Sequence, residues 1–310
     1  MKFALTILGV NSATPAHGRF PSAQILQVQH QLFLIDCGEG SQSQMSRFGV
    51  PHHKIQHIFI SHLHGDHVFG LPGLLFSLGL NDRKNDLHIY APAGLEEMIM
   101  ALLRPMETSL PYPLHFHVLD TGQSTLVFEN DRLTVRSIPL RHRIPTAGFL
   151  FREKERPKNI RPEKIAEYSL NISQILAVKN GENITLANGR ILPNEELTTP
   201  PPVPRSFAYV SDTAYEESII PMIKDVDLLY HEATFCHDLA DYAETTKHST
   251  ALQAATIAKK ARARRLIIGH YSTRYKNIAP LIKEASAVFP ETEPGVEGQE
   301  YEVPLSRVSE

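Results

Sequence analysis

The most informative part of this chain is the stretch Ser61-His62-Leu63-His64-Gly65-Asp66-His67. It carries three histidines and one aspartate within six positions. A chance match to this pattern has odds on the order of one in several hundred. Imidazole nitrogens and carboxylate oxygens are the ligands that suit Zn²⁺ and similar divalent ions. The stretch therefore predicts a metal site, and the alternative is a polar loop rich in histidine.

The spacing within this stretch predicts how the ligands are divided. Side chains two positions apart in an extended segment point to the same side, so His62 and His64 can reach one ion together. Gly65 permits a tight turn. Beyond that turn, Asp66 and His67 would face a second ion.

The segments on either side of the stretch indicate an α/β fold. Residues 55–60 are apolar and β-branched, as in a buried strand, and residues 71–78 begin a helix. Ligand sites in α/β folds lie where strands end and helices begin. Further apolar strands are predicted to end at the polar groups His142, Asp212, His231-Glu232 and His270. A sheet that ends its strands at one rim would bring these groups together.

Composition and charge limit the class of protein. A chain of 310 residues, 42% hydrophobic and 21% charged, is ordinary for a soluble globular protein of one large or two small domains. The net charge of −3 argues against a protein that coats nucleic acid non-specifically. The two cysteines imply no disulfide framework and fit a reducing, cytoplasmic compartment. No apolar run is long enough for a membrane span, and residues 1–10 favour a first strand over a signal peptide.

Two segments outside the strands have their own character. Residues 152–205 are dense in basic residues and glutamates, with Asn-Gly pairs and a proline run at 200–204. They predict a hairpin, roughly 174–191, on a stiff base that projects from the core, whereas a solvated loop of balanced charge is the alternative that composition favours. From residue 290 the sequence lacks periodicity, which predicts a partly disordered tail.

Asp36 follows a predicted strand and lies close to the expected site. Its carboxylate could hold a metal-bound histidine. It could equally cap the helix expected over residues 41–48.

These motifs resemble known families. The segments "HLHGDH" at 62–67, the isolated His142, "SDT" at 211–213 and "GHYS" at 269–272 resemble the metallo-β-lactamase superfamily, which has a four-layer αββα fold. The segments "DCGEGSQSQ" at 36–44, "HEATF" at 231–235, "KHST" at 247–250 and "HYSTRY" at 270–275 resemble the ribonuclease Z family of tRNA 3′-processing endonucleases. The resemblance implies one hydrolase domain over residues 1–289, with 152–205 as an inserted arm after the His142 strand and 290–310 as the tail.

The resemblance also implies a role for each polar residue. One zinc ion would be held by His62, His64 and His142, a second by Asp66, His67 and His270, with Asp212 shared between them. Asp66 would also orient or deprotonate the attacking water. His248 and Glu232 would serve the leaving group, which is sensible for a histidine held by a carboxylate. Alternatively, Glu232 caps a helix or forms a salt bridge, and His248 is only a neighbour of the next helix cap.

Substrate contacts are expected from basic residues. Arg274 could bind a phosphate through two hydrogen bonds, or it could form a surface salt bridge. In the family the arm grips the body of tRNA, which requires phosphate contacts that do not depend on sequence. The arm residues expected to make such contacts are Arg152, Lys154, Arg156 and Lys158.

The expected function is that of a zinc-dependent endoribonuclease. It would cut precursor tRNA 3′ of the discriminator base, leaving a 3′-hydroxyl on the tRNA and a 5′-phosphate on the trailer. Mn²⁺ or Fe²⁺ could occupy the same ligands, and the resemblance implies a homodimer. Two alternatives stay open: a metal-dependent phosphodiesterase or other small-ester hydrolase of the same superfamily, and a non-catalytic tRNA-binding protein.

Overall fold

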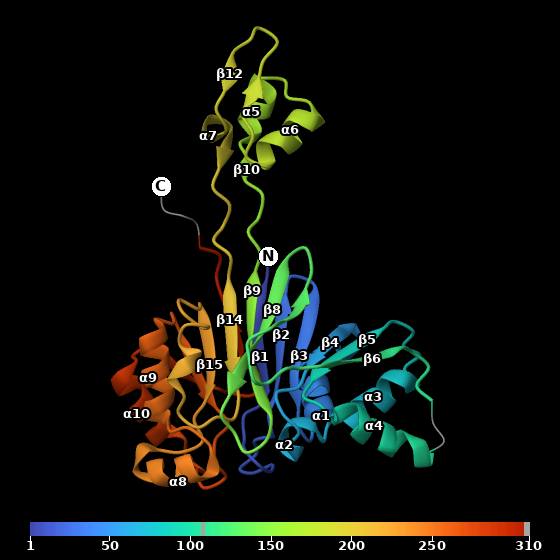
Figure 1. The fold of residues 1–310 in the computed structure, drawn as a ribbon, viewed down its shortest axis with the longest axis vertical. Coiled ribbons are helices and arrows are strands. Elements are labelled where there is room, and N and C mark those ends of the chain that lie inside the picture. The colour runs from blue at the N-terminus through green and yellow to red at the C-terminus, as the bar shows by residue number, and fades with distance from the viewer. Residues whose placement is uncertain (107–108, 307–310) are drawn as a thin grey trace.

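Two β-sheets stacked face to face form the body of the molecule (Figure 1). The computed structural model describes residues 1–106 and 109–306. Helices cover the outer faces of both sheets, so the chain has the expected four-layer αββα architecture. Within the described residues, no helix is long and apolar enough to cross a bilayer.

Each sheet combines segments from distant parts of the chain. In spatial order the first sheet contains β18 (Glu300–Glu302), β1 (Phe3–Gly9), β2 (Ala23–Val28), β3 (Gln31–Cys37), β4 (Ile55–Phe59), β5 (Leu87–Ala91) and β6 (Leu114–Val118). The second contains β17 (Thr292–Pro294), β16 (Leu266–Gly269), β15 (Leu228–Glu232), β14 (Ser206–Val210), β9 (Thr146–Glu153), β8 (Leu133–Leu140) and β7 (Leu126–Glu129).

The helices divide into two groups, one beside each sheet (Figure 1). Beside the first sheet lie α1 (Ser41–Arg47), α2 (Gly65–Val68), α3 (Leu71–Leu80) and α4 (Leu95–Leu103). Beside the second lie α8 (Ala240–Thr246), α9 (Ala251–Ala261) and α10 (Ala279–Val288). Short 3₁₀ turns occur at η1 (His52–Lys54), η2 (Arg104–Met106), η3 (Glu217–Ile219) and η4 (His237–Leu239).

The core between the sheets is rich in aromatic rings. The Phe59 ring stacks on Tyr90 with ring centroids 4.5 Å apart, and it meets Phe149 and Phe151 edge-on at 5.3 Å. All four side chains are buried. Interleaved side chains from two inner faces are how stacked sheets fix their spacing. This core holds the two sheets in a fixed relation, and so fixes the relation between the loops at their edges.

Parallel strand pairs determine where the polar groups lie. In the first sheet β3 pairs parallel to β4 and β4 to β5, and in the second sheet β14 pairs parallel to β15 and β15 to β16. The carboxyl ends of neighbouring parallel strands meet at one edge of a sheet. The polar residues that follow these strands therefore gather at a single edge of the sandwich.

Residues 154–205 form an arm that projects from the body (Figure 1). It contains β10 (Asn159–Ile160), α5 (Pro162–Glu167), α6 (Ile172–Lys179), β11 (Ile184–Thr185), β12 (Ile191–Leu192), α7 (Asn194–Leu197) and β13 (Thr198–Thr199). A small apolar core of its own contains Leu170, Val178, Ile184, Leu192 and Leu197. The predicted hairpin over 174–191 is correct only for β11 and β12. Its first part is helix α6, because the side chains of Asn171 and Gln174 form a capping box at the start of the helix.

The segment after residue 290 differs from the predicted disordered tail. Residues 292–294 form β17, parallel to β16, and residues 300–302 form β18, antiparallel to β1. Strands of three residues are too short to show periodicity, and pairing with an existing strand stabilises them. Residues 307–310 of the predicted tail lie outside the described residues.

Candidate metal centre

The predicted histidine and aspartate residues meet at the edge where the parallel strands end. The ligand atoms of His62, His64, His142 and Asp212 lie within 4.8 Å of one another. Those of Asp66, His67 and His270 form a second group on the same criterion. Each group combines residues that follow strands of both sheets, so the site exists only when the two sheets are packed together.

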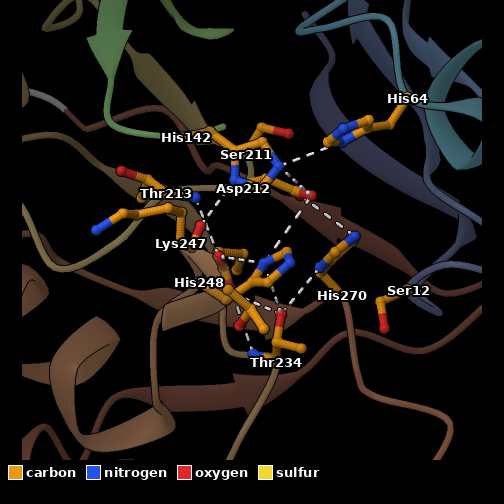
Figure 2. Close-up of polar contacts among 12 residues, drawn as sticks. Ser12, His64, His142, Ser211, Asp212, Thr213, Thr234, Lys247, His248 and His270 are labelled. Atoms are coloured by element: carbon orange, nitrogen blue, oxygen red, sulfur yellow. Dashed lines mark hydrogen bonds and ion pairs between the residues drawn. The ribbon is translucent and has the colours of Figure 1, made fainter. Parts of the chain in front are cut away.

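Asp212, which follows β14, stands between the two groups. Its Oδ2 lies 3.5 Å from Nε2 of His62 and 3.8 Å from Nε2 of His142. Its Oδ1 lies 3.4 Å from Nε2 of His67 and 3.2 Å from Nε2 of His270. Figure 2 shows His142 and His270 converging on this carboxylate from different loops. One oxygen therefore faces each group, as a carboxylate shared by two ions would require.

The donor set fits divalent ions by an independent criterion. Six buried side-chain atoms of the described residues lack a hydrogen-bond partner, and Nε2 of His62 and Oδ1 of Asp212 are two of them. Leaving buried polar atoms unpaired costs free energy, so such atoms call for a ligand. Imidazole nitrogens and carboxylate oxygens suit zinc and neighbouring transition metals. These residues would therefore hold two such ions.

The charges around His67 favour a cation. Burial lowers the pKa of this imidazole, but Asp212, Asp66 and Asp36 together raise it to about 10. The field that holds a proton there would equally attract a divalent ion, which would displace the proton. Burial and the positive field of His67 lower the pKa of His62 well below its ordinary value, which keeps that ring neutral and able to bind a metal.

Asp36 orients His67, which resolves the two alternatives that the sequence left open. Its Oδ2 accepts a hydrogen bond from Nδ1 of His67 at 2.8 Å and another from the Tyr209 hydroxyl at 2.6 Å, and its Oδ1 accepts the Ser61 N–H at 2.7 Å. Helix α1 begins after Gly40 without a side-chain cap, so Asp36 does not cap it. A carboxylate on the far nitrogen fixes the ring orientation of a ligand histidine.

Two other histidines are oriented in the same way. Nδ1 of His142 donates to the Lys247 carbonyl at 2.7 Å, and Nδ1 of His270 lies 3.0 Å from Oγ1 of Thr234. In both rings the opposite nitrogen, Nε2, faces Asp212. His142 lies in the loop after β8, two positions beyond the strand end, and not at the strand end itself.

Glu232 and His248 form a buried pair beside the centre. Nδ1 of His248 lies 3.0 Å from Oε1 of Glu232. Burial lowers the pKa of His248, but Glu232 raises it to about 9. The N-cap of α9 is Thr250, two positions after His248, and the Glu232 carboxylate forms an ion pair with His248 itself. His231 is buried with Nδ1 against the Glu232 carbonyl at 2.6 Å.

An open cavity of about 570 Å³ leads from solvent to these groups. Asp66, His248 and His270 lie along it, with Phe69 and Arg274 among the other lining residues. The Arg274 guanidinium lies 4.5 Å from the ring centroid of Tyr242 and 5.7 Å from that of Phe235. Arg274 forms no salt bridge with any described residue, so the structure does not support the surface salt bridge that was the alternative role for this residue.

Related sequences show the family to which this chain belongs. A ribonuclease Z of Bacteroides thetaiotaomicron is 45% identical over 94% of this chain and 92% of its own length. A ribonuclease Z of Parabacteroides distasonis is 46% identical over 97% of this chain and 99% of its own length. The chain belongs to the ribonuclease Z family. This confirms the resemblance seen in the sequence motifs.

Solved structures agree on the fold of this ribonuclease Z family member. Human tRNase Z, short form, has a TM-score of 0.69 at 27% identity, covering 97% of this chain and 99% of that chain. The metallo-β-lactamase fold protein YhfI of Bacillus subtilis has a TM-score of 0.68 at 21% identity over 97% and 99%, which shows the shared fold. A family model described as Anti-Pycsar protein Apyc1 matches residues 3–154, just under half of the chain.

The residues predicted to bind substrate through the arm do not line the cavity, and they extend from the end of β9 into the arm. Lys154 pairs with Glu129 at 2.6 Å, and Arg156 pairs with Glu153 at 2.7 Å. Lys158 donates to Oδ1 of Asn194 at 2.8 Å, and Arg152 is an exposed residue of β9. Three of the four cations are thus engaged within the chain.

Two residues that shape the site of this ribonuclease Z family member were not predicted from the sequence, Ala13 and Thr234. The backbone N–H of Ala13, which has a positive φ of 62°, donates to Oδ2 of Asp66 at 2.7 Å. Thr234 donates through Oγ1 to Oε2 of Glu232 at 2.7 Å while also contacting His270. The "HEATF" motif contains Thr234, so that contact could have been anticipated, whereas a backbone donor leaves no mark on the sequence.

Proposed function

We propose that this chain is a zinc-dependent endoribonuclease that cuts precursor tRNA 3′ of the discriminator base. Family membership supports the reaction class. The observation that carries the proposal is the position of Asp212, which directs one oxygen toward each of the two ligand groups. Asp212 and His248 both line the cavity. Mn²⁺ or Fe²⁺ would suit the same donors.

Asp66 is assigned to the attacking water. It lines the cavity, and the N–H of Ala13 fixes its Oδ2. Burial raises the pKa of Asp66, but the neighbouring charges of His67 and His270 lower it below the usual range, so the carboxylate is ionised and can accept a hydrogen bond that orients the water. Two bound divalent ions would neutralise charge on the phosphoryl oxygens and favour ionisation of the water.

His248 is assigned to the leaving oxygen. Glu232 engages Nδ1, which leaves Nε2 to donate a proton. The raised pKa of about 9 keeps the ring protonated at neutral pH. Protonation of the departing 3′-oxygen yields a 3′-hydroxyl on the tRNA, and the 5′-phosphate stays on the trailer.

The first experiment is cleavage of an end-labelled precursor tRNA, before and after removal of metal with a chelator, followed by zinc add-back. A single cut at the discriminator, lost with the chelator and restored by zinc, is the expected result. Asp66→Ala is the matched control and should not cut. Uncut precursor together with metal-dependent hydrolysis of a small phosphodiester would overturn the tRNA assignment, and tight binding of the precursor without any turnover would overturn the enzymatic one.

The arm points to a homodimer as the working unit. Strand β9 runs from the edge of the metal centre to the base of the arm, so the arm projects from the opposite end of the body (Figure 1). Eight residues of strand span roughly 25 Å, so an arm on one subunit cannot fold back easily onto its own site. We infer that the arm of one subunit holds tRNA for the site of the other.

Subunit mixing tests this arrangement. A chain lacking residues 155–203 has a site without an arm, and Asp66→Ala has an arm without a working site. Neither should cut precursor tRNA alone, and mixed dimers should recover part of the activity. No recovery in dimers shown to contain both chains would contradict the arrangement, while leaving the cleavage reaction itself untouched.

A further inference from the structure

A second cluster of histidines lies on the first sheet, near its β6 edge. His57, His88 and His115 occupy paired positions on β4, β5 and β6, so their rings follow one row across the sheet. Neighbouring rings stack, with centroids 5.3 Å apart for His57 and His88 and 4.7 Å apart for His88 and His115. His117, two positions beyond His115, lies on the same side of β6. In the described chain, the cavity of the candidate metal centre is lined by other residues.

The nitrogen and oxygen atoms of this cluster are close enough to share one ion. One ligand atom from each of Asp86, His88 and His115 lies within 4.8 Å of the other two. Nε2 of His115 is 3.0 Å from Oδ2 of Asp86. Nδ1 of His88 is 3.0 Å from Nε2 of His117, which leaves Nε2 of His88 for another partner.

Solvent can reach this cluster. The side chain of His115 is 43% exposed and that of Asp86 is 55% exposed. Burial and the neighbouring histidines lower the pKa of His88, while Asp86 raises it. A neutral imidazole is the form that binds a metal.

We propose that Asp86, His88 and His115 form a peripheral binding site for one divalent transition metal ion of the zinc type. Two imidazoles and a carboxylate match the preferences of Zn²⁺, Ni²⁺ and Cu²⁺, with water completing the coordination. His117 would hold the far nitrogen of His88, as the outer partner of a ligand histidine does. The ion would tie β6, the last strand at this side of the sheet, to β5.

Zinc stoichiometry tests this site directly. Metal-free chains are dialysed against buffered micromolar Zn²⁺, and the zinc bound per chain is measured by elemental analysis. The wild-type chain should hold one equivalent more than His115→Ala, and added zinc should raise its unfolding temperature more than that of the variant. His30→Ala is the control, because His30 is an exposed histidine in the turn between β2 and β3 and does not belong to the cluster. It should match the wild type.

Further variants distinguish a specific metal site from weak, non-specific binding of zinc by surface histidines. Asp86→Asn should also lose the equivalent, and His117→Ala should keep it with roughly 10- to 100-fold weaker affinity. His115→Cys should retain it, because a thiolate is also a zinc ligand. Equal zinc in wild type and His115→Ala would overturn the proposal, and so would an equal loss in His30→Ala. The measurement counts only bound zinc, so it does not depend on cleavage activity.

Discussion

Nδ1 of His248 lies 3.0 Å from Oε1 of Glu232, a carboxylate with no exposed surface. The same Oε1 accepts the N–H of Thr213 at 3.0 Å, and Oε2 accepts the N–H of Thr234 at 3.1 Å. Backbone donors thus hold Glu232 ionised in the protein interior, where its charge holds the imidazole of His248 in place. This pair connects the end of β15 to the loop before α9.

Glu232→Gln should lower kcat by about 10²- to 10⁴-fold with little change in KM, because the amide no longer stabilises a protonated His248. The decisive substrate is a precursor with sulfur in place of the scissile 3′-oxygen. Thiolate leaves without protonation, so this substrate should recover most of the lost rate. Asp66→Ala is the control. Asp66 is assigned to the attacking water and not to the leaving oxygen, so the sulfur-containing substrate should not restore the activity of this variant. A Glu232→Gln defect equal on both substrates would contradict the leaving-group role.

Asp36→Asn should weaken metal binding by about 10- to 100-fold, since the amide is a poorer acceptor for the Nδ1–H of His67. The hydrogen bond from Tyr209 keeps the amide in place, so the fold should persist. Zinc competition against a chromogenic chelator measures the change. Asp82→Asn, an exposed aspartate also at positive φ, is the matched control. Unchanged zinc affinity in Asp36→Asn would argue that His67 needs no carboxylate to orient it.

Phe69→Ala should raise KM for precursor tRNA by roughly 5- to 150-fold, the range expected when one stacked base loses its aromatic partner. Phe69 is 68% exposed and lines the cavity beside Asp66, which is a costly place for an apolar ring unless it stacks on a base. Hydrolysis of a small phosphodiester should be unaffected. Equal losses on both substrates would indicate a general distortion of the site.

Glu153→Gln should destabilise the fold by about 3–5 kcal/mol at neutral pH, because it leaves the Arg205 charge buried without its partner. Oε2 of Glu153 accepts from Nε of Arg205, and Oε1 from its terminal nitrogen, both at 2.9 Å. Urea unfolding measures the difference from wild type. Lys154→Gln, which breaks the exposed pair with Glu129, is the control and should cost less than about 1 kcal/mol.

The pH dependence of this difference has a definite sign. Burial raises the pKa of Glu153, but the hydrogen bonds from Arg205 outweigh this and leave it below the ordinary value. The stabilisation is therefore complete above the unfolded-state pKa, about 4.3, and is lost as pH falls through the lower folded-state value. The stability gap between wild type and Glu153→Gln should narrow over that window. A gap that stayed constant there would mean that ionisation of Glu153 does not stabilise the fold.

Local spacing allowed much of the candidate site to be predicted. His62, His64, Asp66 and His67 lie within one loop and one short helix, so geometry over six residues was enough to group them. The polar residues at the ends of strands, such as Asp212 and His270, could be collected because parallel strands end at one edge. The short strands β17 and β18 were not predictable, since their stability comes from pairing with β16 and β1 and not from their own pattern.

The candidate ligand residues could be predicted from local motifs, and the αββα class and the family from the resemblance of those motifs to known families. The tertiary structure was needed to show that each oxygen of Asp212 faces a different group of histidines. It also decided that Asp36 holds His67 rather than a helix, and that the arm leaves the body opposite the metal centre. These relations join residues from separate strands, and their geometry is set by how the two sheets pack, which is a property of the whole core and of no single stretch.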